Sequence, residues 1–455
     1  MSDLGPLEEA DCHGQADLIA AIATAIGPGA VGLVRLSGQG AALALEKAFV
    51  SPTSPASRPR SMVFGKLVHP TTRAILDHVL AAFFPSPCSF TGEDTAEIFC
   101  HGGHTVPRLI LEAFLATGAR LANPGEFTQR AFLNGRLGLD QAEAVAELVA
   151  AQSEAEAALA TRHLEGALSR RIRPAMDGLL GLKAELAAIL DFEEDWDEAK
   201  SSGLLAKLDD LLAELTVLRN IRVCSRVFRD GLRLVLAGRP NAGKSSLFNA
   251  LVGRDRALVS PRPGTTRDFL EAAISWGGLR VELVDTAGLG DCPDDELEAR
   301  GQELARRELE EADVVIWLRP ANDPGPDPPT GLPAAKVLEA TSKADLASGP
   351  SLPERPSLSA LTGQGLDNLK TLVLEMAGVI PDQQPEAVPN LRQQKALEDC
   401  LKCLSHARQA LLGSQPPDII SLEIGAALES LDQITGQILS EDLLAEVFSR
   451  FCVGK

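Results

Sequence analysis

The stretch Gly238-Arg-Pro-Asn-Ala-Gly-Lys-Ser245 decides the fold of the middle of this chain, because it is a complete phosphate-binding loop of the form G-x-x-x-x-G-K-[ST]. The apolar run 232–237 before it predicts a β-strand, and the run 246–252 after it predicts a helix. In such a loop, successive backbone N–H groups point into one concavity that holds phosphate oxygens. The helix that follows adds its positive end. Lys244 is expected at the β- and γ-phosphates and the Ser245 hydroxyl on Mg²⁺, so the chain is predicted to bind a nucleoside triphosphate.

Motifs downstream of this loop predict that the nucleotide is GTP. A strand-like run, 281–284, leads into Asp285-Thr-Ala-Gly288, a D-x-x-G pattern whose carboxylate lies near Mg²⁺ and whose glycine N–H meets the γ-phosphate. A further predicted strand, 336–341, ends in Ser342-Lys-Ala-Asp345. This is close to the N-K-x-D pattern, in which the Asp accepts two hydrogen bonds that guanine offers and adenine does not. Ser342 stands where Asn is usual, and we expect this to weaken base contacts or loop bracing without reversing the preference.

The position after the D-x-x-G glycine bears on mechanism. Many GTPases carry there a Gln that orients the attacking water, and this chain has Leu289, which cannot do so. Another group must hold the water, and the segment 291–298 is rich in carboxylates. No arginine finger can be assigned from the sequence. A monovalent cation ligated by the Asn241 amide is one source of positive charge, and a loop-stabilising amide is the alternative role for Asn241.

Composition limits the class of protein. With 455 residues, 45% of them hydrophobic, the chain is expected to hold two or three domains. It has no apolar run of membrane-spanning length, its acidic start (1–9) lacks the features of a signal peptide, and its eight cysteines form no framework, which together predict a cytoplasmic protein. The net charge of −20 excludes a general polyanion binder. The Cys400-Leu-Lys-Cys403 pair lacks a partner pair for zinc and is predicted to lie on one packed helical face.

The pattern of strand-like and helix-like stretches along the sequence predicts four segments. Residues 1–122 mix strands with helices, residues 123–230 are mainly helical, residues 231–378 hold the nucleotide motifs, and helical texture returns in 379–455. Within the second segment, 141–160 has apolar residues at helical spacing. A helical region split by a nucleotide-binding module predicts that the module is inserted into a helical domain, whose helices its nucleotide state could tilt.

Several further stretches have no part in the nucleotide motifs. They are Gly32–Gly38, Ser89–Asp94, Cys100–Gly103, Pro124–Gly135, Leu139–Glu143 and the tail Phe451–Lys455. Together with the nucleotide motifs, they make the chain resemble the MnmE (TrmE) family of tRNA modification GTPases over nearly its full length.

The resemblance implies a multidomain α/β plus α fold. An N-terminal α+β folate-binding-like domain dimerises, an α-helical domain follows, and a Ras-like P-loop α/β GTPase domain is inserted in the helical one. The implied activity is that of a potassium-activated GTPase that works on tRNA with a flavin-dependent partner, MnmG (GidA), in a heterotetramer-type complex. The implied product is a carboxymethylaminomethyl-type group on carbon 5 of the wobble uridine.

The same resemblance implies the residues of the GTPase site. Those expected to contact GTP are Asn241, Ala242, Gly243, Lys244, Ser245, Ser246, Ser260, Gly264, Thr265, Thr266, Asp285, Thr286, Ala287, Gly288, Ser342, Lys343, Asp345, Ser359 and Ala360. Mg²⁺ is expected on Ser245 and Thr266, and K⁺ on Asn241 with backbone oxygens near Ser260, Arg262 and Thr265. Glu298 is expected to orient the water, with Glu296 as the alternative, and Lys244 and Asn241 are the other catalytic candidates.

Outside the GTPase site, the resemblance implies a site for 5-formyltetrahydrofolate or a related tetrahydrofolate. Arg35, Arg136 and Lys455 are expected on pterin oxygens and glutamate carboxylates, and Glu97 on the pterin N–H groups. Arg136 stands where Lys is more usual. Cys452 in the tail is a candidate reactive thiol, and a packed apolar role is the alternative.

Two other functions stay open at this point. One is a regulatory or ribosome-assembly GTPase switch without one-carbon chemistry, since a fold does not determine a function. The other is a folate-dependent one-carbon transfer enzyme whose GTPase is only regulatory. Folate binding through residues 1–120 is expected for the tRNA-modifying enzyme and for the one-carbon enzyme, and is not expected for the switch.

Overall fold

The structure, a computed structural model, forms two compact units. The N-terminal unit comprises Met1–Ala146 and Thr435–Lys455, and the large unit comprises Glu147–Ile434. The domain boundaries that we expect after residues 122, 230 and 378 divide the chain more finely and stay predictions. The residues that the structure describes are 17–191, 198–220, 227–228, 231–255, 270–286, 306–322, 327–328, 336–346, 355–379, 385–436, 441–449, 451 and 454.

The N-terminal unit is built on a seven-stranded sheet with the order β3-β4-β5-β6-β2-β1-β7. β1 pairs with β7 in parallel, and all the other neighbours are antiparallel. The strands are β1 (Ile19–Ile22), β2 (Val31–Ser37), β3 (Phe49–Val50), β4 (Val63–Val68), β5 (Ile75–Phe84), β6 (Thr95–His101) and β7 (Arg120–Leu121).

Helices α1 (Ala41–Ala48) and α2 (Thr105–Leu115) pack against one face of this sheet. Side chains alternate between the two faces along each strand, so β2 and β6 bury Val34, Leu36 and Ile98 in that core. The residues between them, among them Arg35, therefore lie on the other face. The strands and helices found here confirm the mixture of the two that the sequence predicts for this part of the chain.

The unit also contains α3 (Glu126–Leu133), the C-terminal α14 (Glu441–Ser449) and the part of α4 (Leu139–Ala150) up to Ala146. Leu139 and Ala142 of α4 pack with Val447 and Phe448 of α14 and with Phe451. The helical spacing over 141–160 does not give one helix, because α4 ends at Ala150 and α5 (Glu154–Leu164) begins after an N-cap at Ser153. The Ser153 oxygen accepts from the Glu156 N–H at 3.2 Å, and the Glu156 carboxylate accepts from the Gln152 N–H at 2.7 Å.

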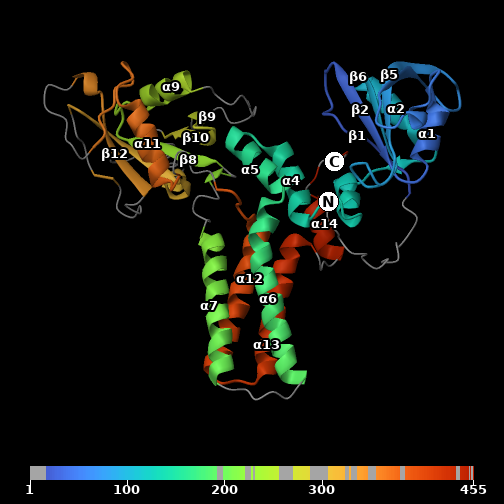
Figure 1. Ribbon diagram of the computed structural model, residues 1–455. Helices are drawn as coiled ribbons and strands as arrows, with labels where there is room; N and C mark the ends of the chain where they lie inside the picture. The colour runs from blue at the N-terminus through green and yellow to red at the C-terminus, as the bar shows by residue number, and fades with distance from the viewer. Residues whose placement is uncertain are drawn as a thin grey trace. The chain divides into compact units, whose positions relative to one another are not determined.

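In the large unit, five strands form a sheet with the order β12-β11-β8-β10-β9 (Figure 1). β8, β10, β11 and β12 pair in parallel, and β9 is antiparallel to β10. The strands are β8 (Leu232–Gly238), β9 (Leu270–Trp276), β10 (Leu279–Asp285), β11 (Val314–Pro320) and β12 (Val337–Ser342). The predicted strands at 232–237, 281–284 and 336–341 are thus found, and they bring the ends of β8, β10 and β12 to one edge of the sheet.

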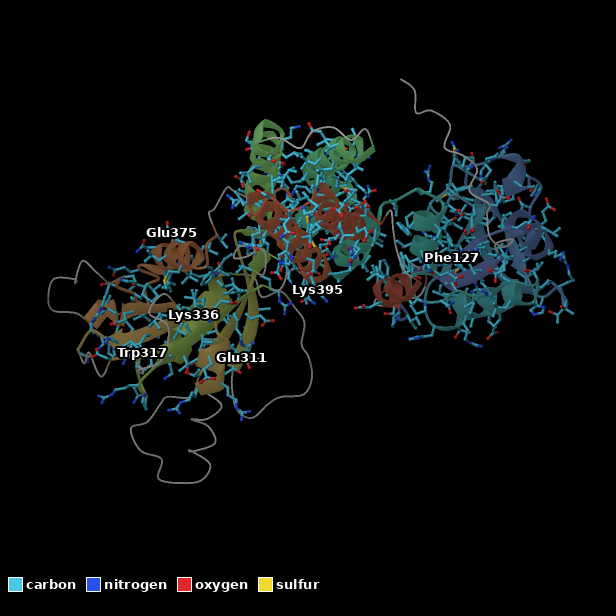
Figure 2. All side chains as sticks on the ribbon, turned by 90° about the horizontal axis from the view of Figure 1, so that it is seen from below. Phe127, Glu311, Trp317, Lys336, Glu375 and Lys395 are labelled. Carbon is cyan, nitrogen blue, oxygen red and sulfur yellow. The ribbon has the colours of Figure 1, made fainter. Side chains whose placement is uncertain are left out.

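This sheet is buried on both faces, as parallel sheets usually are. Helices α9 (Lys244–Arg254) and α11 (Leu366–Met376) contribute Leu247, Leu251 and Leu369 to one core. The other core holds Val235 and Trp317 with residues of the helical segment 306–311. Figure 2 labels Trp317 in this part of the molecule and Phe127 in the N-terminal unit.

Four long helices lie side by side in the large unit, as Figure 1 shows. Their buried stripes form one apolar core, and a capping box of Asn390 and Gln393 fixes the start of one of them. Cys400 is fully buried in this core and Cys403 packs against it, as expected for two cysteines on one packed face. The helices are α6 (Ala167–Asp191), α7 (Glu198–Asn220), α12 (Leu391–Leu412) and α13 (Pro417–Thr435).

Among the described residues, no helix combines the length and the apolar character needed to cross a membrane.

Candidate functional site

The phosphate-binding loop lies between β8 and α9, where the sequence predicts it. Gly238, Asn241 and Gly243 have positive φ values of 142°, 61° and 93°, so the loop uses left-handed backbone that glycine and asparagine tolerate best. Lys244 is the first residue of α9, and its ammonium donates to the carbonyl oxygens of Gly238 (3.1 Å) and Arg239 (3.0 Å). Burial lowers the pKa of Lys244, while the nearby Asp285 carboxylate opposes this shift.

The Mg²⁺ side of the site joins this loop to the end of β10. The Ser245 hydroxyl donates to Oδ2 of Asp285 at 2.6 Å, and the Asp285 Oδ1 atom is buried without a hydrogen-bond partner among the described residues. Burial raises the pKa of Asp285, although the hydrogen bond from Ser245 and the charge of Lys244 oppose the shift. An orphaned carboxylate oxygen beside a serine hydroxyl is the oxygen chemistry that Mg²⁺ or its bound water prefers. The residues present therefore fit the metal.

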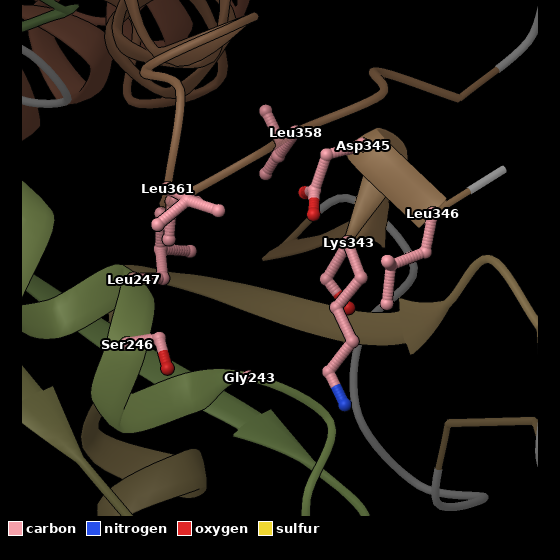
Figure 3. A pocket seen from close by; sticks show the side chains of 10 residues that line it. Gly243, Ser246, Leu247, Lys343, Asp345, Leu346, Leu358 and Leu361 are labelled. Atoms are coloured by element: carbon pink, nitrogen blue, oxygen red, sulfur yellow. The ribbon is translucent and has the colours of Figure 1, made fainter.

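A cavity of about 230 Å³ lies beside the loop, and Figure 3 shows its lining. In this view Leu247 and Leu361 lie next to each other on one side of the cavity, and Asp345, Lys343 and Leu346 lie on the other side. The Asp345 carboxylate is fixed by the buried Ser359 hydroxyl, which donates to Oδ1 at 2.5 Å. Apolar walls with one oriented carboxylate suit a flat ring that offers two adjacent N–H donors, as guanine does.

The cavity brings together residues from several of the predicted nucleotide motifs, and it also has leucines that were not among the predicted GTP contacts. Ser342, Lys343, Asp345, Ala360 and Ser246 all line it, as expected for GTP contacts. The lining also includes Leu247, Leu346, Leu358 and Leu361. Leu361, which is 86% exposed, directly follows Ser359 and Ala360, two residues expected to contact GTP.

Thr286 is buried, and its hydroxyl donates to the Leu236 carbonyl oxygen at 2.8 Å, so its side chain ties the end of β10 to β8. Several residues that the sequence analysis singles out lie outside the described residues: Ser260, Arg262, Gly264, Thr265, Thr266, Ala287, Gly288, Leu289, Glu296, Glu298, Cys452 and Lys455.

A second candidate site lies on the open face of the N-terminal sheet. Arg35 of β2 and Glu97 of β6 are register partners, and their side chains form an ion pair at 2.7 Å with about one sixth of each exposed. The guanidinium also lies over the rings of Phe90 (5.6 Å) and Phe127 (5.8 Å). These two rings were missed from sequence, although both stand in stretches that carry the family resemblance.

A third residue expected here, Arg136, lies close to the loop before β6, because a Cβ on Gly92 would be 3.3 Å from its Cγ. A planar heterocycle with N–H donors and carbonyl oxygens fits a half-buried Arg–carboxylate pair flanked by two aromatic rings. The residues that the structure describes therefore fit a pterin.

A network of charges supports this second site. Arg130 contacts Glu93 (3.1 Å), Glu126 (3.2 Å) and Asp17 (2.7 Å), and Arg120 pairs with Glu126 and Asp17 as well. Hydrogen bonding to Arg120 holds the pKa of Asp17 below its usual range. For Glu126, burial raises the pKa, but hydrogen bonds from Arg120 and a backbone N–H outweigh it and the net pKa is lowered.

Ser37 joins the network, since its hydroxyl donates to Glu93 at 2.7 Å and meets the Thr91 hydroxyl at 2.7 Å. The stretches Ser89–Asp94 and Pro124–Gly135 thus meet in space. Their charged residues hold the N-terminal unit together beside the Arg35–Glu97 pair.

Comparison with protein families matches nearly the whole chain. Residues 18–136 match the model of the GTP-binding protein TrmE N-terminus, and residues 139–452 match the model of the MnmE helical domain. The tRNA modification GTPase MnmE of Thermus thermophilus is 41% identical over 439 residues, which cover 96% of this chain and 99% of the relative. The tRNA modification GTPase MnmE of Syntrophus aciditrophicus is 40% identical over 460 residues, with coverage of 96% and 99%.

Solved structures match only part of the chain. The G domain of the FeoB iron transporter of T. maritima is 28% identical and covers 32% of this chain and 98% of its own, with a TM-score of 0.26. Aquifex aeolicus Era bound to GDP and AlF4⁻ is 25% identical and covers 38% of this chain and 66% of its own, with a TM-score of 0.24.

Proposed function

Because this chain belongs to the MnmE family of tRNA modification GTPases, we propose that it couples K⁺-assisted GTP hydrolysis to the modification of the wobble uridine. It is a GTPase that acts in tRNA modification and takes GTP with Mg²⁺. The proposed product is a carboxymethylaminomethyl-type group on carbon 5 of that uridine, made together with a flavin-dependent MnmG partner. The observation that carries the GTPase part is the Ser245–Asp285 contact next to a cavity that contains Asp345.

For the hydrolytic step, we assign roles to the residues of the loop and its surroundings. The Lys244 ammonium, which has two carbonyl partners in this structure, exchanges them for β- and γ-phosphate oxygens. Ser245 and Thr266 hold Mg²⁺, which neutralises charge on those phosphates when bound. Glu298 orients the attacking water, with Glu296 as the alternative, since Leu289 has no polar atom to do so.

The K⁺ proposal rests on Asn241. Its side chain is exposed and forms no hydrogen bond with any residue in the described part of the chain, so its amide oxygen is free for a cation. This argues against the alternative of a loop-stabilising amide. The remaining ligands are backbone oxygens at Ser260, Arg262 and Thr265. A ring of neutral oxygens is the set that an alkali cation prefers.

GTP hydrolysis in KCl against NaCl tests this proposal. We expect K⁺ to raise kcat by at least about tenfold, which is about 1.4 kcal/mol of barrier, and Asn241→Ala to abolish the difference while GDP affinity stays within about threefold. Asn390→Ala is the matched control, because this amide caps α12 and lies outside the nucleotide motifs. Equal rates in both salts for the unaltered chain would refute the cation mechanism.

For the folate, we propose that Arg35, Glu97, Arg136 and Lys455 bind 5-formyltetrahydrofolate on the open face of the N-terminal sheet. The half-buried Arg35–Glu97 pair and the two flanking rings support this. Glu97→Gln keeps the shape and removes the charge that pairs with Arg35. We expect it to weaken folate binding by about tenfold or more, measured by calorimetry. Glu112→Gln, on the exposed surface of α2, is the control. Unchanged affinity in Glu97→Gln would exclude this site.

We also propose that the chain forms a homodimer through the N-terminal sheet. Phe64, Leu80, Phe99 and Leu33 are register partners on neighbouring strands, so they form one apolar row across the open face. Phe64 is 65% exposed and Leu80 is 39% exposed. A contiguous apolar row of this kind is typical of an interface. In sedimentation equilibrium, we expect Phe64→Glu to give monomers, whereas Leu43→Glu on the opposite side of the sheet stays dimeric.

The remaining assignments are cytoplasmic location and a heterotetramer-type complex with MnmG on tRNA. Their support is family membership. A bacterium that lacks its own MnmE should recover the modified wobble uridine when this chain is expressed, and mass spectrometry of digested tRNA measures this. Recovery with Glu97→Gln would show that the proposed folate site is not needed for the modification. Failure to recover with the unaltered chain would refute the tRNA assignment.

A further inference from the structure

Ser342, the last residue of β12, links the loop that we expect to contact the base to the phosphate-binding loop. Its hydroxyl lies 2.6 Å from the carbonyl oxygen of Ala242, one hundred residues earlier in the chain, and both residues are buried. A carbonyl oxygen only accepts, so the serine is the donor in this bond. A hydroxyl has a single hydrogen, and Ser342 therefore has no second hydrogen to donate to a ligand.

The position of Ser342 determines which edge of the base it faces. Asp345 lies where it can accept from the N1–H and N2–H donors of guanine. The sugar is attached to the five-membered ring and leads to the phosphates, so this ring lies closest to the phosphate-binding loop. Ser342 adjoins that loop, since a Cβ on Gly243 would be 3.7 Å from Ser342 Cβ and 3.8 Å from its Oγ. The five-membered ring, with its N7 acceptor, therefore passes beside Ser342.

We propose that Ser342 offers no donor to N7 of guanine and that, among the described residues, Asp345 at the Watson–Crick edge is the side chain that selects the base. This rests on the proposed role of Asp345 as the residue that contacts guanine. The Asn that is usual at this position has two N–H donors and one acceptor, so it can brace a loop and donate to a ligand together. Serine keeps the first of these functions and loses the second.

The Lys343 side chain reaches the same part of the phosphate-binding loop as Ser342, since its Cε would lie 4.0 Å from a Cβ on Gly243. Lys343 has a left-handed backbone (φ 57°), and in Figure 3 its ammonium lies at the far end of the cavity from Asp345, towards Gly243. That direction suits the sugar and phosphates. The specificity of this chain then depends on Asp345 and its Ser359 support.

Nucleotide analogues test this directly on the full chain. In 7-deaza-GDP a carbon replaces N7, and in inosine diphosphate the N2 amino group is absent. For the unaltered protein, we expect calorimetry to give dissociation constants for GDP and 7-deaza-GDP within about twofold, and inosine diphosphate about tenfold weaker, because a hydrogen bond to a charged group is lost. A preference of fivefold or more for GDP over 7-deaza-GDP would overturn the proposal.

Variants at Ser342 separate its two functions. Ser342→Asn should make GDP bind about two- to tenfold tighter than 7-deaza-GDP, since the new amide restores a donor to N7. Ser342→Ala should weaken both nucleotides by the same factor, since it removes only the bond to Ala242. Ser430→Ala is the matched control, because its buried hydroxyl also donates to a backbone carbonyl, at 2.9 Å, within α13. If Ser342→Asn still treats both nucleotides alike, Ser342 does not face N7.

The inosine result distinguishes this inference from the proposed function. If inosine diphosphate binds as well as GDP, the assignment of Asp345 is wrong and the guanine site itself fails. If inosine diphosphate is rejected and 7-deaza-GDP is rejected too, the guanine site stands and only the statement about N7 is wrong.

Discussion

Replacing Arg130 with methionine tests whether the charged residues of the Pro124–Gly135 stretch act in folding. Only about 10% of the Arg130 side chain is exposed, and 14% of Glu93 and 8% of Glu126. Glu126 keeps Arg120 as a partner in the variant. Glu93 keeps the Ser37 hydroxyl and loses the one cation with which it pairs among the described residues.

The size of the effect follows from Glu93, whose largely buried carboxylate loses its cation in the variant. Removing one partner of a buried ion pair costs about 3–5 kcal/mol, and the lower end applies here because Glu93 keeps a hydrogen bond and some exposure. At about 2–4 °C per kcal/mol for a domain of about 150–250 residues, the melting temperature of the N-terminal unit should fall by about 6–12 °C. The double variant Arg130→Met with Glu93→Gln removes the stranded charge and should recover about half of this loss.

The distribution of tryptophan makes the measurement specific. The chain has three tryptophans and no tyrosine, and Trp196, Trp276 and Trp317 all belong to the large unit. Tryptophan fluorescence therefore follows the large unit, whereas calorimetry follows both units. We expect Arg130→Met to move a calorimetric transition and leave the fluorescence transition in place. A shift below about 2 °C, or a double variant less stable than the single one, would refute the reasoning.

Three further predictions concern pH and the nucleotide site. The lowered pKa values of Asp17 and Glu126 stabilise the N-terminal unit above about pH 4.5, so its melting temperature should fall as the pH drops through and below that value, and this acid loss should be smaller in Glu126→Gln. Ser359→Ala removes the hydroxyl that fixes Asp345 and should weaken GDP binding about fivefold, as measured by calorimetry, while adenine nucleotides, which do not use this carboxylate, should be unaffected. Asp285→Asn removes charge beside Ser245 and should weaken the Mg²⁺ dependence of GTP binding by about tenfold in a metal titration, with unchanged Mg²⁺ dependence as the contrary result.

The nucleotide motifs could be predicted from sequence because each is a short string whose spacing is set by one strand, one loop and one helix. The strands β8, β10 and β12 were expected where they lie, and the parallel sheet then brings their ends together. The bond from Ser342 to Ala242 could not be foreseen, because it joins residues one hundred positions apart and depends on that assembled sheet edge. We expected serine at this position to weaken base contacts or loop bracing; the bracing bond is present, and the effect on base contacts stays a prediction.

In the N-terminal unit, the sequence identified Arg35, Glu97 and Arg136 only through the family resemblance. Their surroundings depend on strand register and on the meeting of distant stretches, as when Asp17 contacts Arg130. The helix break before α5 is different, because its signal was present. Ser153-Glu-Ala-Glu156 is a capping-box sequence, and it outweighs the continuous helical spacing of 141–160.

The pair formed by Lys244 and Asp285 shows how this chain prepares its nucleotide site. Burial disfavours the charged form of each, lowering the pKa of the lysine and raising that of the aspartate. Each charge is offset by neighbouring groups, two backbone carbonyls for Lys244 and the Ser245 hydroxyl for Asp285. A triphosphate beside the ammonium and Mg²⁺ beside the carboxylate supply stronger partners of opposite charge, so both desolvation costs are relieved in the same complex. The ligand and its metal should therefore bind cooperatively. Because Asp285→Asn removes one of the two buried charges, GTP binding in that variant should depend less on Mg²⁺ even where the phosphate contacts of Lys244 are intact.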